Sequence, residues 1–205
     1  DDFAKKYNIE ELARELELFF TGYGYGYFSA VPAAYVLKYF NWDTVKSFAK
    51  RTIYTFPNGI QHLWTAVAKR HDVKLNTSIN KITRKEKVVI ETGKETLEFD
   101  ALIVTSPLDE AINYVDVSKE EANLFSKIQF VDYRTIVCSV QGLEKVSGYV
   151  PGNFSSARSG HPVFWYFRHE ESDIYMFYVL ADSGQSDDEV VENTRNLIEK
   201  MGGRL

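Results

Sequence analysis

The sequence predicts an α+β protein in which a helical cluster packs on a mixed, largely antiparallel β-sheet. Apolar residues recur at helical spacing over the first part of the chain, whereas β-type apolar runs fill the middle and residues 134–180. The elements follow one another as helices, then strands, more strands and a terminal helix, unlike a regular βαβ repeat. With 205 residues, 44% of them hydrophobic, the chain can bury a core of its own.

The helices come first. Apolar residues such as Leu12 and Leu16 recur at spacings of three and four, which predicts one amphipathic helix over residues 3–20. A second helix is expected over residues 30–40. A third is expected over residues 44–50, with Asp43 as its N-terminal cap.

We expect three parts along the chain. Residues 1–70 form the helical part, residues 71–108 a β-meander with a final buried strand, and residues 109–205 a sheet with a terminal helix.

A strictly alternating tract, Gly22-Tyr-Gly-Tyr-Gly-Tyr27, follows the first helix. Glycine is permissive in loops, so we expect an extended or looped segment that displays Tyr23, Tyr25 and Tyr27. A phosphate-binding loop is rejected, because the Rossmann fingerprint G-x-G-x-x-G must directly follow a strand and none does so here. Two interpretations stay open: a structural turn, and a tyrosine-lined wall that faces an apolar substrate.

Residues 56–108 predict a glycine-led helix followed by strands. Pro57-Asn58-Gly59 makes a turn before the helix, and a short strand is expected at residues 73–75. Further strands carry Ile79, residues 88–90 and residues 97–99, with Gly93-Lys94 as a hairpin turn. The apolar run at residues 101–104 is typical of a strand buried on both faces.

The second half predicts capping boxes and long strands. Ser118 and Ser186 each precede a glutamate by three residues and are expected to open helices. Strands are expected at residues 134–140, 163–168 and 173–180. Because Phe164-Trp-Tyr-Phe167 places aromatic rings on both faces of its strand, one face must meet a second apolar surface. That surface is either a substrate cavity or a face covered by another domain.

Composition excludes several classes of function. A net charge of −5 argues against a nucleic-acid partner, which needs a basic face. The four histidines lack ligand spacing, so no metal site is expected. Cys138 is the single cysteine, so an intrachain disulfide is excluded.

Targeting signals are also missing from the sequence. No run of 18 apolar residues and no signal-peptide pattern occurs, so we expect no transmembrane segment and a cytoplasmic location. The chain begins without Met and ends just after a predicted helix, which leads us to expect an excised piece of a longer protein.

The stretch Phe56-Pro-Asn-Gly-Ile-Gln-His-Leu63, Ile79-Asn-Lys-Ile82 and Phe99-Asp-Ala-Leu-Ile-Val-Thr-Ser-Pro107 resembles the flavin-dependent amine oxidase superfamily. That superfamily includes protoporphyrinogen oxidases and phytoene-type desaturases. The resemblance implies that FAD binds the full-length parent, with cofactor contacts from Gly59, Ile79, Thr105, Ser106 and Pro107.

The Rossmann fingerprint and the family's C-terminal flavin segment have no counterpart here. The resemblance therefore implies a substrate-domain fragment that partners a missing FAD-binding domain of the same parent chain. The fragment alone is expected to bind no FAD tightly and to be inactive.

The resemblance also bears on the substrate. Many family members hold a water near the flavin with a lysine, and Arg134 takes that approximate position here. Arginine suits a substrate carboxylate better than proton transfer, although a surface residue at a strand start is the simpler interpretation. The candidate substrate-binding residues are therefore Arg134, Tyr23, Tyr25, Tyr27 and Trp165. No catalytic residue is assigned.

Two functions stay open at this point. The first is the substrate-binding domain of an FAD-dependent oxidoreductase whose parent oxidises, desaturates or isomerises a small apolar molecule. The alternative is a non-catalytic α+β binding or scaffold module, in which the aromatic residues form the core.

Overall fold

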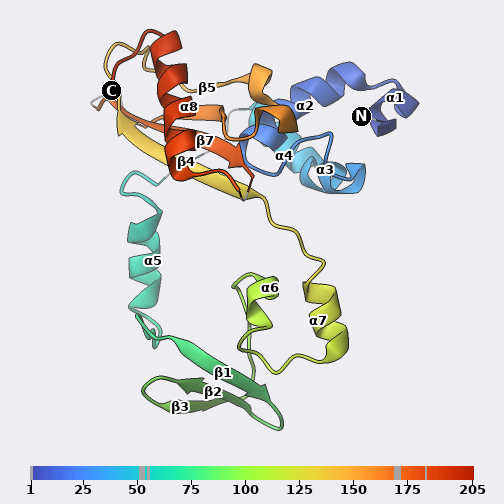
Figure 1. Ribbon diagram of the computed structural model, residues 1–205, viewed down its shortest axis with the longest axis vertical. Helices are drawn as coiled ribbons and strands as arrows, with labels where there is room; N and C mark the ends of the chain where they lie inside the picture. Colours follow the sequence, from blue (N-terminus) through green and yellow to red (C-terminus); the bar gives the residue numbers. More distant parts are fainter. Residues whose placement is uncertain (1, 51–53, 55, 169–171, 183) are drawn as a thin grey trace. The chain divides into compact units, whose positions relative to one another are not determined.

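In the computed structural model, residues 2–50, 54, 56–168, 172–182 and 184–205 are described (Figure 1). Contacts between residues divide the chain into two compact units. Unit 1 comprises Asp1–Thr52 and Val131–Leu205, and unit 2 comprises Ile53–Phe130. Unit 2 is therefore inserted between two segments of unit 1.

Unit 1 contains the helices α1 (Asp2–Tyr7), α2 (Glu10–Gly22), α3 (Ala33–Tyr39), α4 (Trp42–Ala49) and α8 (Asp187–Lys200), the strands β4 (Asp132–Ser139), β5 (Gly148–Tyr149), β6 (Pro162–Phe167) and β7 (Ile174–Ala181), and the 3-10 turns η1 (Pro151–Asn153) and η2 (Ser156–Arg158). Its strands form one four-stranded sheet in the order β4-β7-β6-β5, with antiparallel pairing throughout.

Helix α8 covers one face of this sheet (Figure 1). Its buried residue Ile198 packs with Val140, Tyr175 and Phe177, and Val190 packs with Val179. Because side chains alternate along a strand, the neighbouring residues of β7, Tyr178 and Leu180, point to the opposite face. That second face packs on the N-terminal part of the chain through the buried residues Tyr27 and Phe164.

The single helix expected over residues 3–20 was wrong, because the structure breaks it at Asn8 into α1 and α2. Asn8 has φ of 53°, a left-handed conformation that Asn tolerates better than most residues and that cannot continue a helix. The cap of α4 also differs from expectation. The Oδ1 atom of Asn41, not Asp43, accepts the backbone N–H groups of Asp43 and Thr44, each at 3.0 Å.

At α8 the expected capping box is half formed. The Ser186 hydroxyl accepts from the Glu189 backbone N–H at 3.2 Å. The Glu189 carboxylate instead accepts from the Gln185 side chain.

Unit 2 contains α5 (Ile60–Ala68), β1 (Ile79–Arg84), β2 (Val88–Thr92), β3 (Thr96–Phe99), α6 (Leu108–Ala111) and α7 (Lys119–Phe125). The strands form the antiparallel meander β1-β2-β3 that the sequence predicts, with the hairpin turn after Thr92. Ser118 and Glu121 form the complete capping box at α7.

Two further strand predictions in this unit were wrong. Residues 73–75 and 101–104 form no strand, and Leu75 and Ile103 are 77% and 88% exposed. A strand needs a hydrogen-bonded neighbour, and the sheet of unit 2 ends at β1 and β3 without pairing to either segment. Residues 101–104 therefore have no strand partner among the described residues, with Leu102 and Val104 half-buried and Ile103 exposed.

Candidate substrate-binding site

The face of the four-stranded sheet opposite α8 is apolar and rich in tyrosine. In register across the strands lie Thr135, Tyr178, Phe164 and Tyr149. Tyr178 stacks on Phe164 with ring centroids 5.5 Å apart, and Tyr133 stacks on Tyr178 at 5.6 Å. Cross-strand partners point to the same face, so these rings form one aromatic surface. We call it the aromatic face.

The alternating glycine–tyrosine tract is built to lie against the aromatic face. A Cβ atom at Gly22 would come within 2.6 Å of the Tyr149 ring, and one at Gly24 within 2.7 Å of the Tyr133 ring. The Tyr133 hydroxyl donates a hydrogen bond of 2.6 Å to the Gly22 carbonyl oxygen. The glycines therefore allow the backbone to approach the rings closely, which explains two of the three glycines in the tract.

The tyrosine hydroxyls on this face stay protonated at neutral pH. Burial is the largest cause that raises the pKa of Tyr133, Tyr149 and Tyr178 above the ordinary 10.0, and neighbouring phenols raise it further. The strand residues that point to this face include no charged side chain. The surface is suited to an apolar ligand rather than to acid–base chemistry.

The three tyrosines of the tract have three different surroundings. Tyr23 packs on Phe164 of the aromatic face, with centroids 5.7 Å apart. Tyr25 turns to the helices and packs on Tyr39 at 4.5 Å. Tyr27 is 9% exposed and belongs to the core. The structure therefore places only Tyr23 where it borders the aromatic face and keeps part of its surface open.

One end of the aromatic face is open. Val137, Met176 and Tyr166 are neighbours across β4, β7 and β6, so they form the row next to Thr135 and Tyr178. Val137 is 58% exposed, and Met176 and Tyr166 are half-buried. The sequence indicated this row only through the aromatic residues on both faces of β6. Residue alternation predicts the face to which a side chain points, but not which end of the aromatic face is exposed to solvent.

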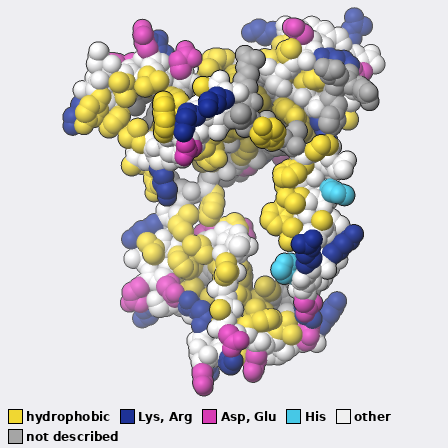
Figure 2. All heavy atoms as spheres, turned by 180° about the vertical axis from the view of Figure 1, so that it is seen from behind, with side chains coloured by type: hydrophobic (Ala, Val, Ile, Leu, Met, Phe, Trp, Pro, Cys, Tyr) yellow, Lys and Arg dark blue, Asp and Glu magenta, His cyan; other side chains and the backbone are white. Residues whose placement is uncertain are grey.

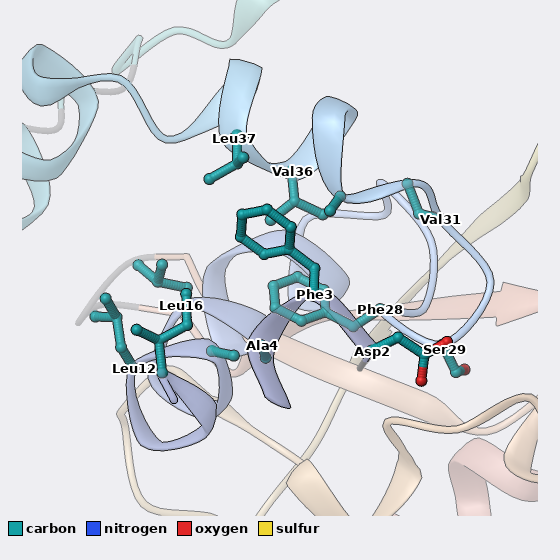
Figure 3. A pocket seen from close by; sticks show the side chains of 13 residues that line it. Asp2, Phe3, Ala4, Leu12, Leu16, Phe28, Ser29, Val31, Val36 and Leu37 are labelled. Carbon is teal, nitrogen blue, oxygen red and sulfur yellow. The ribbon is translucent and has the colours of Figure 1, made fainter. Parts of the chain in front are cut away.

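An apolar cleft of about 270 Å³ lies among α1, α2 and α3 (Figure 3). Leu12 and Leu16 of α2 line one side, and Val36 and Leu37 of α3 line the other, with the Phe3 and Phe28 rings between them. The sequence predicts the apolar stripe of α2 as part of an amphipathic helix, but not the cleft that the stripe lines. Leu12 and Leu37 are instead 54% and 53% exposed.

Arg134 and Trp165 lie on the α8 face of the sheet, away from the aromatic face. Arg134 is paired in register with Val179 and donates to Asp132 at 2.7 and 3.0 Å and to Asp187 at 3.2 Å. These carboxylates raise its pKa further. The indole N–H of Trp165 donates to the Val146 carbonyl oxygen at 3.0 Å. The structure does not bring these two residues together with the tyrosines of the tract.

The residues expected to contact a cofactor all belong to unit 2. Gly59 precedes α5 with φ of 77°, Ile79 begins β1 and is 44% exposed, and residues 105–107 form the exposed loop before α6. The Ser106 hydroxyl is hydrogen-bonded to the Tyr114 hydroxyl. These residues do not line the α1–α3 cleft. They also do not line a second cavity, which lies beside α8 and is described below.

Unit 2 also exposes apolar surface and unpaired backbone. Ile60, Leu63, Trp64 and Val67 lie on one face of α5 and are 36–59% exposed, and hydrophobic side chains gather along this helix in Figure 2. Residues 101–106 donate no backbone hydrogen bond to another described residue. Exposed groups of this kind are typical of a surface that contacts another domain. Such a contact buries the apolar side chains and gives the unpaired N–H groups hydrogen-bond acceptors.

The described residues contain neither a metal-binding cluster nor a membrane-spanning helix. Among the described residues, no group of histidine, cysteine and acidic side chains could hold a metal ion. Within the same residues, no helix is both long enough and apolar enough to span a bilayer.

Comparison with known proteins identifies the family. The model of the flavin-containing amine oxidoreductase family matches residues 2–204, so the chain belongs to this family. Among solved structures, it is similar to the CLA-producing fatty acid isomerase from P. acnes, with 33% sequence identity and a TM-score of 0.90. The match covers 99% of this chain and 50% of that one, so the chain spans half the length of this relative. No curated protein matches the sequence.

Proposed function

We propose that the chain is the substrate-binding half of an FAD-dependent enzyme that acts on an unsaturated fatty acid or a similar apolar chain. Membership of a flavin-containing family supports the cofactor class. The similarity over 99% of the chain to a fatty acid isomerase supports the substrate class. Among oxidation, desaturation and isomerisation, this similarity favours migration of a double bond.

The observation that carries the proposal is the open end of the aromatic face. Val137, Met176 and Tyr166 offer an apolar row, and the residues of β4, β6 and β7 that point to the same face are uncharged. An acyl chain laid along this row removes apolar surface from water at about 25 cal/mol per Å². Tyr178 and Tyr23 border the row, and their rings limit the shape that the substrate can take.

The cofactor contacts come from unit 2 in this proposal. Residues 101–104 supply a strand to the FAD-binding half, where their free N–H groups find partners, and Gly59, Ile79 and residues 105–107 approach FAD. Bound FAD supplies the hydride chemistry. The residues of this chain bind the acyl chain, orient it and exclude water from it. A cytoplasmic location belongs to the same proposal.

The test is an assay of the full-length flavoprotein with polyunsaturated fatty acids. We expect a conjugated-diene absorbance to develop without consumption of oxygen, and mass spectrometry to show a product of unchanged mass. A product two hydrogens lighter would assign desaturation or oxidation instead. If a flavin-loaded protein binds no fatty acid and turns over none, the substrate class is refuted and the non-catalytic alternative gains support.

A further inference from the structure

A second cavity lies on the α8 side of the sheet of unit 1. It is bounded by α8 and by the segment that carries η1, η2 and the start of β6. Its volume is about 380 Å³, within the size range of small-molecule sites. It shares no lining residue with the α1–α3 cleft, and none of its lining residues points to the aromatic face. The proposed fatty-acid site therefore leaves this cavity without a role.

The charge of the cavity has one sign. Arg158 and Lys200 line it, and none of its lining residues is Asp or Glu. This is unusual for a chain whose net charge is −5. Within the described residues, the terminal nitrogens of Arg158 and the ammonium of Lys200 have no hydrogen bond or ion pair.

Two acidic residues of α8 near the cavity in sequence are engaged elsewhere. Glu192 pairs with Arg195 at 3.5 Å, and Glu189 accepts from Gln185 at 3.3 Å. The cations of the cavity are thus not neutralised by these two carboxylates.

Buried amides hold the cavity in shape. Asn153 is 7% exposed, and its Nδ2 donates to the Pro162 carbonyl oxygen at 2.7 Å. Its Oδ1 accepts from Nε of Arg158 at 3.2 Å, which fixes one edge of the guanidinium and leaves the terminal nitrogens available. Nδ1 of His161 lies 3.3 Å from the Ser159 carbonyl oxygen.

The amides of α8 complete the wall. Asn193 donates from Nδ2 to the Gly160 carbonyl oxygen at 3.0 Å, which ties α8 to the loop before β6. Asn196 also lines the cavity, one turn from Lys200. The cavity thus combines hydrogen-bond donors with positive charge, the combination that recognises oxyanions.

We propose that this cavity is a binding site for a small oxyanion, a phosphate or a carboxylate group, with Arg158 and Lys200 as its cationic contacts. The guanidinium binds two oxygens of the anion side by side, and the ammonium neutralises its charge. The site lies across the sheet from the aromatic face, so its ligand is distinct from the apolar substrate.

The test is calorimetric titration of the full-length flavoprotein with inorganic phosphate and, separately, with acetate, at constant ionic strength. We expect saturable binding of at least one anion. Arg158→Gln should weaken it about tenfold, because a hydrogen-bonded charge contributes about 1.5 kcal/mol or more. Lys200→Gln should weaken it several-fold. Arg195→Gln is the matched control, since it removes an α8 cation that does not line the cavity; because it also frees Glu192, it should change the dissociation constant much less than Arg158→Gln does.

The two titrations also separate the ligand classes. Saturation with phosphate alone assigns a phosphate-bearing ligand, and saturation with acetate alone assigns a carboxylate. The proposal is overturned if neither anion saturates, or if Arg195→Gln weakens binding as much as Arg158→Gln. Circular dichroism of each variant confirms folding. Flavin content and fatty-acid turnover are measured independently, so a failure here leaves the proposed function untouched.

Discussion

Gly24 lies directly against the ring of Tyr133. Its φ is 84°, and a Cβ atom there would be 2.7 Å from three ring carbons. The same ring stacks on Tyr178 of the neighbouring strand and donates its hydroxyl proton to Gly22. The Tyr133 ring therefore packs between Gly24 and Tyr178. The tract that follows α2 can lie this close to the sheet because Gly24 has no side chain.

Replacing Gly24 by alanine should destabilise unit 1 by about 1–3 kcal/mol, since it adds both backbone strain and an overpacked contact. Urea unfolding followed by circular dichroism measures the change. Gly152→Ala is the control, because a Cβ there meets nothing within 4 Å, and its φ needs no glycine. Equal midpoints for the two variants would contradict the assigned role of Gly24.

Arg84 forms a fork that should make stability depend on pH. Its guanidinium donates to both oxygens of Glu121 at 2.8 Å and to Asp116 at 2.8 Å. This pairing lowers the pKa of Glu121 from 4.5 to about 2 and also lowers the pKa of Asp116. A lowered pKa in the folded state stabilises above the unfolded pKa, and this stabilisation is lost as the pH falls through the folded pKa.

We therefore expect the urea concentration at the unfolding midpoint to decrease as the pH is lowered from 4.5 to about 2. Arg84→Gln should lower the midpoint at neutral pH and flatten this fall. The effect is small, because the three side chains are 30–38% exposed to solvent. Lys85→Gln removes a neighbouring charge and serves as the control. An Arg84→Gln midpoint with the wild-type pH dependence would show that the fork is not responsible.

Val137→Asp should impair the substrate site without unfolding the protein. The side chain is 58% exposed at the open end of the aromatic face, so a carboxylate there remains hydrated but disfavours an apolar ligand. We expect the KM for a fatty acid to rise about tenfold or more, with little change in Tm. Val191→Asp is the control, an exposed valine on α8. The assigned face is wrong if both variants keep the wild-type KM.

Arg134→Gln tests whether Arg134 holds a substrate carboxylate or only joins β4 to α8. The side chain is 20% exposed, and its nitrogens donate to Asp132 and Asp187. From these contacts we expect a small loss of stability and an unchanged KM. Parallel assays use the free fatty acid and its methyl ester. A KM that rises for the free acid alone would instead establish the carboxylate role.

The 205-residue chain by itself should retain little flavin. The expected cofactor contacts are exposed residues of unit 2, and pyrophosphate binding normally relies on a glycine-rich strand-to-helix turn, a motif that follows no strand of this sequence. Purified under identical conditions, the chain should be colourless, whereas its full-length parent should be yellow. Flavin released by denaturation gives the stoichiometry. A near-equimolar flavin content in the short chain would contradict this prediction.

Local patterns predict much of this fold. The meander of unit 2, the long strands of unit 1 and the cap at Ser118 follow from hydrophobic alternation and capping residues, which act over a few positions. The helix break at Asn8 has no such signal, because the apolar periodicity continues across it. Residues 101–104 show the opposite failure, since they carry a strand pattern but pair with no strand among the described residues.

The candidate site is predicted less completely. Composition indicates an aromatic surface, but the face on which Arg134 or Trp165 lies depends on strand register, which a single sequence does not give. The cations of the second cavity come from η2 and α8, so no spacing in the sequence brings them together.

The insertion of unit 2 within unit 1 has a consequence for biosynthesis. The Gly22 carbonyl accepts its hydrogen bond from a tyrosine 111 residues later, and the whole of unit 2 is translated between the two. At 5–20 residues per second, roughly, α2 leaves the ribosome many seconds before its sheet exists. During that interval its apolar stripe is a target for chaperones, and unit 2, whose contacts are local, is free to fold first.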